Sequence, residues 1–130
     1  MAISYRPASI GMLNLDTHIL IHALRDSLTA AERRLLSRES WSISAIVLWE
    51  MAKLSQLKRI AIDLESPDFT RILGRIRVWP LDLVVCRQTT ALDFRGDAAD
   101  EIIAATSVVH RVPLLTRDRQ IRRSKLVPLA

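Results

Sequence analysis

The sequence predicts one α/β domain, built on a short central parallel β-sheet with helices on both of its faces. Its length of 130 residues is typical of one compact domain. Short apolar segments alternate with longer amphipathic ones, which favours parallel strands joined by crossover helices. No repeat, low-complexity segment or linker divides the chain. We therefore expect one domain over residues 1–130, with 1–10 as a flexible N-terminal segment.

The first half of the chain alternates between the two kinds of element. We expect a strand at 11–15, helices at 19–24 and 29–37, a strand at 41–44, a helix at 45–57 and a helix that begins at Pro67. Asp16 and Thr17 offer an N-cap after the first strand. The helix at 29–37 is amphipathic, with Glu32 on its solvent side. Pro67 suits a first helical position, where its missing N–H costs nothing.

The second half continues the alternation. We expect a strand at 78–81, helices at 82–94 and 97–110, a strand at 113–116 and a last edge strand at 126–127. Pro80 limits the first of these strands because proline cannot donate to a β-ladder. Cys86 follows Leu83, Val84 and Val85, so we expect a buried core thiol.

Composition excludes several classes of protein. No run approaches the roughly 20 apolar residues that span a bilayer, and the N-terminus lacks the apolar stretch of a signal peptide, so we expect a soluble, cytoplasmic protein. A single cysteine rules out an internal disulfide and a cysteine-based zinc site. Lys and Arg number 19 against 14 Asp and Glu, a balance that attracts nucleic acid or an acidic partner. An ordinary solvated basic surface explains this charge equally well.

Five carboxylates stand beside apolar segments: Asp16, Glu50, Asp97, Asp100 and Asp118. Carboxylates rarely enter protein interiors unless they are paired or bind a cation. Asp16 follows the first predicted strand and Asp118 follows the strand at 113–116. Sites in open parallel sheets form at the carboxyl ends of the strands, so both belong to one edge of the sheet. The set predicts one shared site.

Each acid also has a simpler explanation. Asp16 and Asp118 are well placed to cap helices, and Asp97 and Asp100 begin a helix, where they complement its dipole. Glu50 resists this explanation because it lies in mid-helix, on the stripe of Ile46, Val47 and Leu54. A salt bridge to an arginine is the alternative for Glu50, and metal coordination is the interpretation we favour.

An oxygen-only site of this kind suits Mg²⁺, with Mn²⁺ as a substitute. Such an ion activates water and stabilises a phosphate leaving group, so a basic surface around an acidic pocket indicates a nuclease. His18 and His22 lie four residues apart without a glutamate between them, which argues against zinc. The chain also lacks a G-x-S-x-G elbow and a glycine-rich phosphate loop.

Four segments carry a family resemblance, in family order and over nearly the whole chain. Residues 15–20 (LDTHIL) resemble the opening motif of PIN-domain proteins, and 44–52 (SAIVLWEMA) resemble the second, with its S-x-x-S/L-W-E pattern. Residues 96–106 (GDAADEIIAAT) resemble the D-P-x-D-R-x-I-A-A-T/Q helix, and 114–118 (LLTRD) the closing L-L-T-x-D. The chain resembles the VapC-type toxins of bacterial toxin–antitoxin pairs.

The resemblance implies a Mg²⁺-dependent endoribonuclease that cleaves RNA and inhibits translation, forms a homodimer and is neutralised by a VapB-like antitoxin. It implies that Asp16 and Asp100 are the most direct metal ligands and that Glu50 and Asp118 complete the pocket. Asp97 matches an extra acid of one branch. The hydroxyl residue of the last motif is Thr116, which supports the site, and we add Thr17 in the same role.

Two positions depart from the family pattern. Ala98 stands where the third motif has proline, and Glu101 where it has arginine, so any contact of that arginine is absent here. Many relatives also carry an acid a few residues after Asp118, whereas this chain has Ile121 and bases there. Asp118 must then supply the fourth carboxylate.

Two other functions compete with the nuclease. The first is a non-catalytic PIN-like module that binds RNA or protein. The second is a phosphatase of the haloacid-dehalogenase type with Asp16 as nucleophile, which wants a second aspartate where His18 stands. The RNA target leaves no signature in the sequence. Four arginines flank the motifs as candidate phosphate contacts or plain surface bases: Arg25, Arg95, Arg117 and Arg119.

Overall fold

The computed structural model describes residues 11–130, so the expectation for segment 1–10 lies outside the described residues. The strands are β2 (Met12–Leu15), β3 (Ser40–Ser44), β4 (Arg77–Trp79) and β5 (Leu114–Leu115). The helices are α1 (Thr17–Leu24), α2 (Ala30–Arg38), α3 (Ala45–Gln56), α4 (Pro67–Leu73), α5 (Leu83–Thr89), α6 (Ala98–His110) and α7 (Arg119–Arg122). Each helix within residues 11–130 is too short or too polar to cross a membrane.

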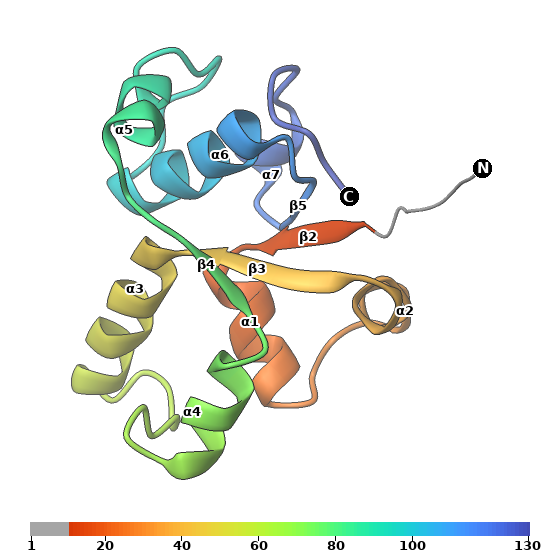
Figure 1. Cartoon of the computed structure of the whole chain (residues 1–130), viewed down its shortest axis with the longest axis vertical. Coiled ribbons are helices and arrows are strands. Elements are labelled where there is room, and N and C mark those ends of the chain that lie inside the picture. Colours follow the sequence, from red (N-terminus) through yellow and green to blue (C-terminus); the bar gives the residue numbers. More distant parts are fainter. Residues whose placement is uncertain (1–10) are drawn as a thin grey trace.

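The strands form one parallel sheet in the order β4-β3-β2-β5. Leu13 of β2 lies opposite Trp41 of β3, and Leu15 lies opposite Leu115 of β5. Figure 1 shows α1, α3 and α4 below the sheet and α5 and α6 above it. The predicted α/β fold is therefore confirmed, and the carboxyl ends of all four strands meet at one edge.

The core explains why the strands read as continuous apolar runs. Leu15, Ile43 and Leu114 are completely buried because helices cover both faces of the sheet. Val47 of α3 and Ile103 of α6 are equally buried and supply those covers. Burial of each such side chain contributes about 1.5–3 kcal/mol relative to exposure, which fixes the strands that carry the site.

Capping residues define where the helices begin, and the sequence predicts this role for Asp16 and Asp118. The Asp16 side chain caps α1, Ser44 caps α3, Asp97 caps α6 and Asp118 caps α7, each by accepting a backbone N–H of the first turn. Three of these four caps are members of the predicted acidic site. Their position at the junction of strand or loop with helix brings them to the same edge of the sheet.

The predicted helix at 82–94 is too long, since α5 ends at Thr89. The hydroxyls of Thr89 and Thr90 donate to the carbonyls of Cys86 and Arg87, which competes with continuation of the helix. The prediction of a buried Cys86 is wrong, because this thiol is exposed. α5 buries Val85 and leaves Leu83 and Val84 at the surface. The apolar run is therefore longer than the part of α5 that packs against the core.

The edge strand predicted at 126–127 is also wrong. The backbone N–H groups of Leu126 and Val127 both donate to the hydroxyl of Ser124, at 3.1 Å each, which forms a turn instead. The C-terminal segment pairs with β5 through one parallel bridge, between Leu114 and Leu129.

Candidate functional site

One cavity of about 480 Å³ opens at the carboxyl edge of the sheet. All five carboxylates that the sequence singles out line this cavity, which we call the acidic cavity. The remaining lining residues are His18, His22 and Arg117. The residue after β2, Asp16, and the loop after β5 that carries Asp118 therefore contribute to one place, as their positions at the carboxyl ends of parallel strands predict.

Asp16 is the most deeply placed of the five, with 5% of its surface exposed. The backbone N–H of Thr17 donates to its Oδ1 at 2.7 Å, and the hydroxyl of Thr116 donates to its Oδ2 at 2.5 Å. Burial raises the pKa of Asp16, while these two hydrogen bonds act in the opposite direction. Thr116 thus joins the end of β5 to the carboxylate at the end of β2.

Glu50 lies on α3 and points toward α1, where the hydroxyl of Thr17 donates to its Oε1. The side chain is half-buried, and burial raises its pKa, with Asp16 and Asp97 adding to the effect. No ion pair of Glu50 with an arginine is found within residues 11–130. Its partner is a neutral hydroxyl, so the salt-bridge explanation does not account for its position.

Asp100 is the carboxylate whose ionisation the site alters most. Burial, followed by repulsion from Asp97, Asp16, Asp118 and Glu50, raises its pKa to about 7. Asp97 is exposed and its Oδ1 accepts the backbone N–H of Asp100 at 2.9 Å. The two acids therefore differ: Asp97 caps α6, and Asp100 faces the other carboxylates from the first turn of that helix.

Asp118 follows β5 by three residues and is partly buried. Its Oδ1 accepts the backbone N–H of Ile121 at 3.0 Å, and its own N–H donates to the hydroxyl of Thr116 at 3.0 Å. Thr116 accordingly holds both Asp16 and the backbone of Asp118. Capping and membership of the acidic cavity are compatible roles for this residue.

The five carboxylates surround the cavity without converging on one point. Among residues 11–130, no three His, Cys, Asp or Glu side chains form a complete metal-binding group. Several carboxylate oxygens are turned toward helix N-termini and hydroxyls, as described above. The cavity concentrates negative charge, which adds to burial in raising the pKa of Asp100.

The prediction for Glu32 is wrong, and the sequence does not predict the contacts that Arg117 makes. Glu32 is predicted to lie on the solvent side of α2, but it is 9% exposed. It accepts hydrogen bonds from Arg117 Nε at 2.8 Å and Nη2 at 2.7 Å. The pattern Thr29-x-x-Glu32 forms a capping box and was the available signal. His22 accepts from Arg117 Nη1 at 3.1 Å, which occupies one of its ring nitrogens.

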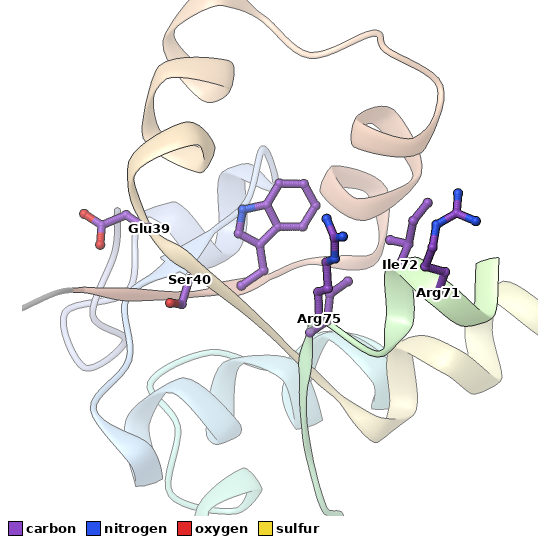
Figure 2. A pocket seen from close by; sticks show the side chains of 7 residues that line it. Glu39, Ser40, Arg71, Ile72 and Arg75 are labelled. Atoms are coloured by element: carbon purple, nitrogen blue, oxygen red, sulfur yellow. The ribbon is translucent and has the colours of Figure 1, made fainter. Parts of the chain in front are cut away.

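A second cavity of about 350 Å³ lies at the other end of the sheet, where β3 begins. Arg71 and Ile72 project from α4 and Arg75 from the segment after it, while Glu39 and Ser40 come from the start of β3 (Figure 2). The lining of this cavity includes one carboxylate, that of Glu39, whereas five carboxylates line the acidic cavity. The two cavities are chemically different, and the carboxylates gather at one of them.

Comparison with known families identifies this arrangement. A model of the PIN domain matches residues 14–125, which include all five carboxylates and both supporting threonines. The chain belongs to the PIN domain family. A curated relative is ribonuclease VapC22 of Mycobacterium tuberculosis, which is 29% identical over 96 residues, covering 72% of this chain and 74% of that protein.

Solved structures show the same fold. VapBC2 of Rickettsia felis, bound to a DNA fragment from its promoter, aligns with a TM-score of 0.70 and 17% identity over 92% of this chain and 97% of that one. FitAcB of Neisseria gonorrhoeae aligns with a TM-score of 0.60 and 24% identity over 85% and 90%. The resemblance of this PIN domain to VapC-type toxins is confirmed by these comparisons.

Proposed function

We propose that this PIN domain is the toxin of a toxin–antitoxin pair and acts as a Mg²⁺-dependent endoribonuclease that inhibits translation. The observation that carries the proposal is the acidic cavity, where four other carboxylates help to raise the pKa of Asp100 to about 7. The carboxylates repel one another when all of them are charged, and a bound divalent cation would relieve this repulsion. The similarity to ribonuclease VapC22 supports RNA as the substrate.

The donor set fits Mg²⁺ or Mn²⁺. Both ions prefer carboxylate oxygen, and the acidic residues of the cavity offer it from four elements or loops. Asp16 and Asp100 are the proposed direct ligands, Glu50 and Asp118 complete the set, and Asp97 is the less central fifth acid. When bound, the ion supplies an activated water and stabilisation of the leaving oxygen.

The remaining chemistry belongs to the chain itself. Thr116 and Thr17 hold Asp16 and Glu50 by hydrogen bonds, so these carboxylates keep one orientation toward the cavity. Arg117, which also lines the cavity, favours the approach of an RNA phosphate that the five acids alone would repel. The reaction that results is hydrolysis of a phosphodiester bond.

The test is cleavage of cellular RNA by the purified chain with Mg²⁺ or Mn²⁺. We expect fragments that EDTA abolishes and that added metal restores. A PIN-like module that only binds RNA or protein would bind without cleavage, and its binding would survive EDTA and Asp16→Asn. Absence of any cleavage with either metal would overturn the proposal. Sequencing of RNA ends after brief expression would identify the target.

A VapB-like antitoxin is the proposed partner, because the structural relatives include toxin–antitoxin complexes. The acidic cavity offers such a protein a simple means of inhibition: a cationic side chain placed among the carboxylates would compete with the metal. A structure of the complex should show that side chain in the cavity. An inhibited complex with the cavity untouched would contradict this mode.

A homodimer is proposed from the surface around β4 and α5. Four exposed apolar residues, which we call the β4–α5 patch, gather in this short stretch: Val78, Leu81, Leu83 and Val84, with 36–62% of their surface exposed. Grouped exposed apolar side chains mark interaction surfaces more often than scattered ones do. A second copy of the chain is the occupant that the family resemblance implies.

A further inference from the structure

Arg117 occupies an unusual position, on the boundary between two differently charged hollows. It lines the acidic cavity on one side. On the other it lines a groove formed by α2, the end of β5 and α7, which we call the arginine groove. The charged side chains of that groove are three arginines and one glutamate: Arg117, Arg119, Arg122 and Glu32.

The guanidinium of Arg117 is held in place from two directions. Its Nε and Nη2 donate to the two oxygens of Glu32, a bidentate pair that lowers the pKa of Glu32 to about 2. Its Nη1 donates to Nε2 of His22 at 3.1 Å. Because arginine stays protonated, His22 must be the acceptor, which leaves the proton on Nδ1 for the hydroxyl of Ser27 at 2.8 Å.

This arrangement leaves one edge of the guanidinium available. Arginine has five N–H donors, and the bonds to Glu32 and His22 account for three of them. No acceptor within residues 11–130 is found for the other two, one on Nη1 and one on Nη2. The free N–H of Nη2 lies on the edge that Nη2 shares with Nη1, because the pair with Glu32 uses the N–H beside Nε, and there it can meet an oxygen of a phosphate. The side chain is 40% exposed, so a ligand can reach it.

We infer that this edge of Arg117 binds a phosphodiester of the RNA substrate and that the RNA strand runs from the acidic cavity across Arg117 into the arginine groove. The inference rests on the proposed nuclease function and adds the path of the substrate. A polyanion avoids five carboxylates unless its neighbouring phosphates are held elsewhere. Arg119 and Arg122 are exposed on α7 and continue the positive surface away from the cavity.

The test measures how salt weakens RNA binding. All variants carry Asp100→Asn to prevent cleavage, and the probe is a fluorescent single-stranded RNA of mixed sequence, titrated between about 50 and 200 mM KCl. Each phosphate contact on a single strand contributes about 0.7 to the slope of log affinity against log salt. Arg117→Ala should reduce the slope by about that amount and weaken binding about tenfold at low salt. The double variant Arg119→Ala, Arg122→Ala should reduce it by about 1.4.

The matched control is Arg75→Ala, which removes one exposed arginine from the cavity of Figure 2 and should leave the slope unchanged. Arg117→Lys is a second variant, for use if Arg117→Ala is unstable, because lysine keeps the positive charge at this position. It should keep the slope while raising KM for cleavage in the otherwise wild-type chain, because lysine lacks the planar guanidinium.

The outcomes separate the two proposals. If the wild-type chain does not cleave RNA, the nuclease proposal fails. If it cleaves, but Arg117→Ala changes only thermal stability and neither the salt slope nor KM, then Arg117 is a structural clamp and the inferred path is wrong. An equal loss of slope with Arg75→Ala would also overturn it, since binding would then follow net charge alone.

Discussion

At the scale of single residues, the site depends on carboxylates held at raised pKa and on the hydroxyls that orient them. Burial and repulsion from four neighbouring carboxylates both disfavour the charged form of Asp100 and raise its pKa to about 7. Thr116 contacts Asp16 and the backbone of Asp118 at once. Each property leads to a measurable consequence.

The metal-free protein should lose stability as pH rises through the range in which Asp100 ionises. Its folded pKa of about 7 exceeds the value of 3.8 expected when unfolded, so the folded chain holds a proton that the unfolded chain has lost. The free energy of unfolding should therefore fall between about pH 4 and pH 7. Melting in EDTA would measure this, and Asp100→Asn should flatten the trend. A stability that rises over this range in the metal-free chain, unaffected by Asp100→Asn, would contradict the assignment.

Thr116→Val should weaken metal binding without unfolding the chain. Valine keeps the shape of threonine but cannot donate to Asp16 Oδ2, so the carboxylate loses its orientation. Loss of such a supporting contact costs roughly 10- to 100-fold in metal affinity. Calorimetric titration with Mn²⁺ measures this. Thr106→Val is the matched control, because that buried hydroxyl donates to the carbonyl of Ile102 and touches no carboxylate. Equal affinities for the two variants would refute the role of Thr116.

At the scale of elements, long-range contacts of polar groups join the pieces that carry the site. Asn14 of β2 donates through its Nδ2 to Ser107 of α6 at 2.9 Å, which fixes the strand before Asp16 to the helix that carries Asp100. Glu32 of α2 joins Arg117 in the loop after β5. Neither contact is encoded by periodicity, because the partners lie 93 and 85 residues apart.

Glu32→Gln should destabilise the chain at neutral pH by about 1–2 kcal/mol, allowing for the exposure of Arg117. The pKa of Glu32 is about 2 in the folded chain and 4.5 in the reference state, so its contribution is present above pH 4.5 and is lost as pH falls toward 2. Urea unfolding at several pH values should show the deficit of the variant shrinking below about pH 4. A deficit independent of pH would mean that shape, and not charge, matters at this position.

The β4–α5 patch gives a prediction about assembly. Leu83 is 62% exposed on α5, and a glutamate there would place a charge in the proposed contact between two copies. Leu83→Glu should shift the chain from dimer to monomer in light scattering while its circular dichroism stays unchanged. Leu57→Glu is the control, since Leu57 is 63% exposed at the end of α3, outside the patch. Dimers that survive Leu83→Glu would place the interface elsewhere.

At the scale of the whole molecule, the sequence predicts the features that depend on local pattern. The parallel sheet and most helix starts follow from apolar runs and capping residues such as Asp16 and Asp118. The meeting of Asp16 and Asp118 follows from topology, because parallel strands bring their carboxyl ends to one edge of the sheet. For Glu50 the sequence predicts a partly buried carboxylate that needs a partner, but it does not predict that this partner is Thr17.

Features that depend on tertiary contacts escape such reasoning. The exposure of Cys86 depends on how much of α5 the core covers, which no periodicity specifies. The turn at 126–127 depends on one hydroxyl, that of Ser124. The burial of Glu32 requires Arg117, a residue of the last motif whose role the sequence leaves open between phosphate contact and surface base.

One matched pair of variants shows whether the acidic cavity is the place where RNA is cleaved. Asp100→Asn removes a carboxylate from the cavity, and Asp68→Asn removes an exposed one on α4 that pairs with Arg71. With Mg²⁺ present, we predict that Asp68→Asn cleaves cellular RNA as the wild type does and that Asp100→Asn loses cleavage by at least about 100-fold, the scale of an essential catalytic group. Equal cleavage by the two variants would mean that the acidic cavity is not the catalytic site.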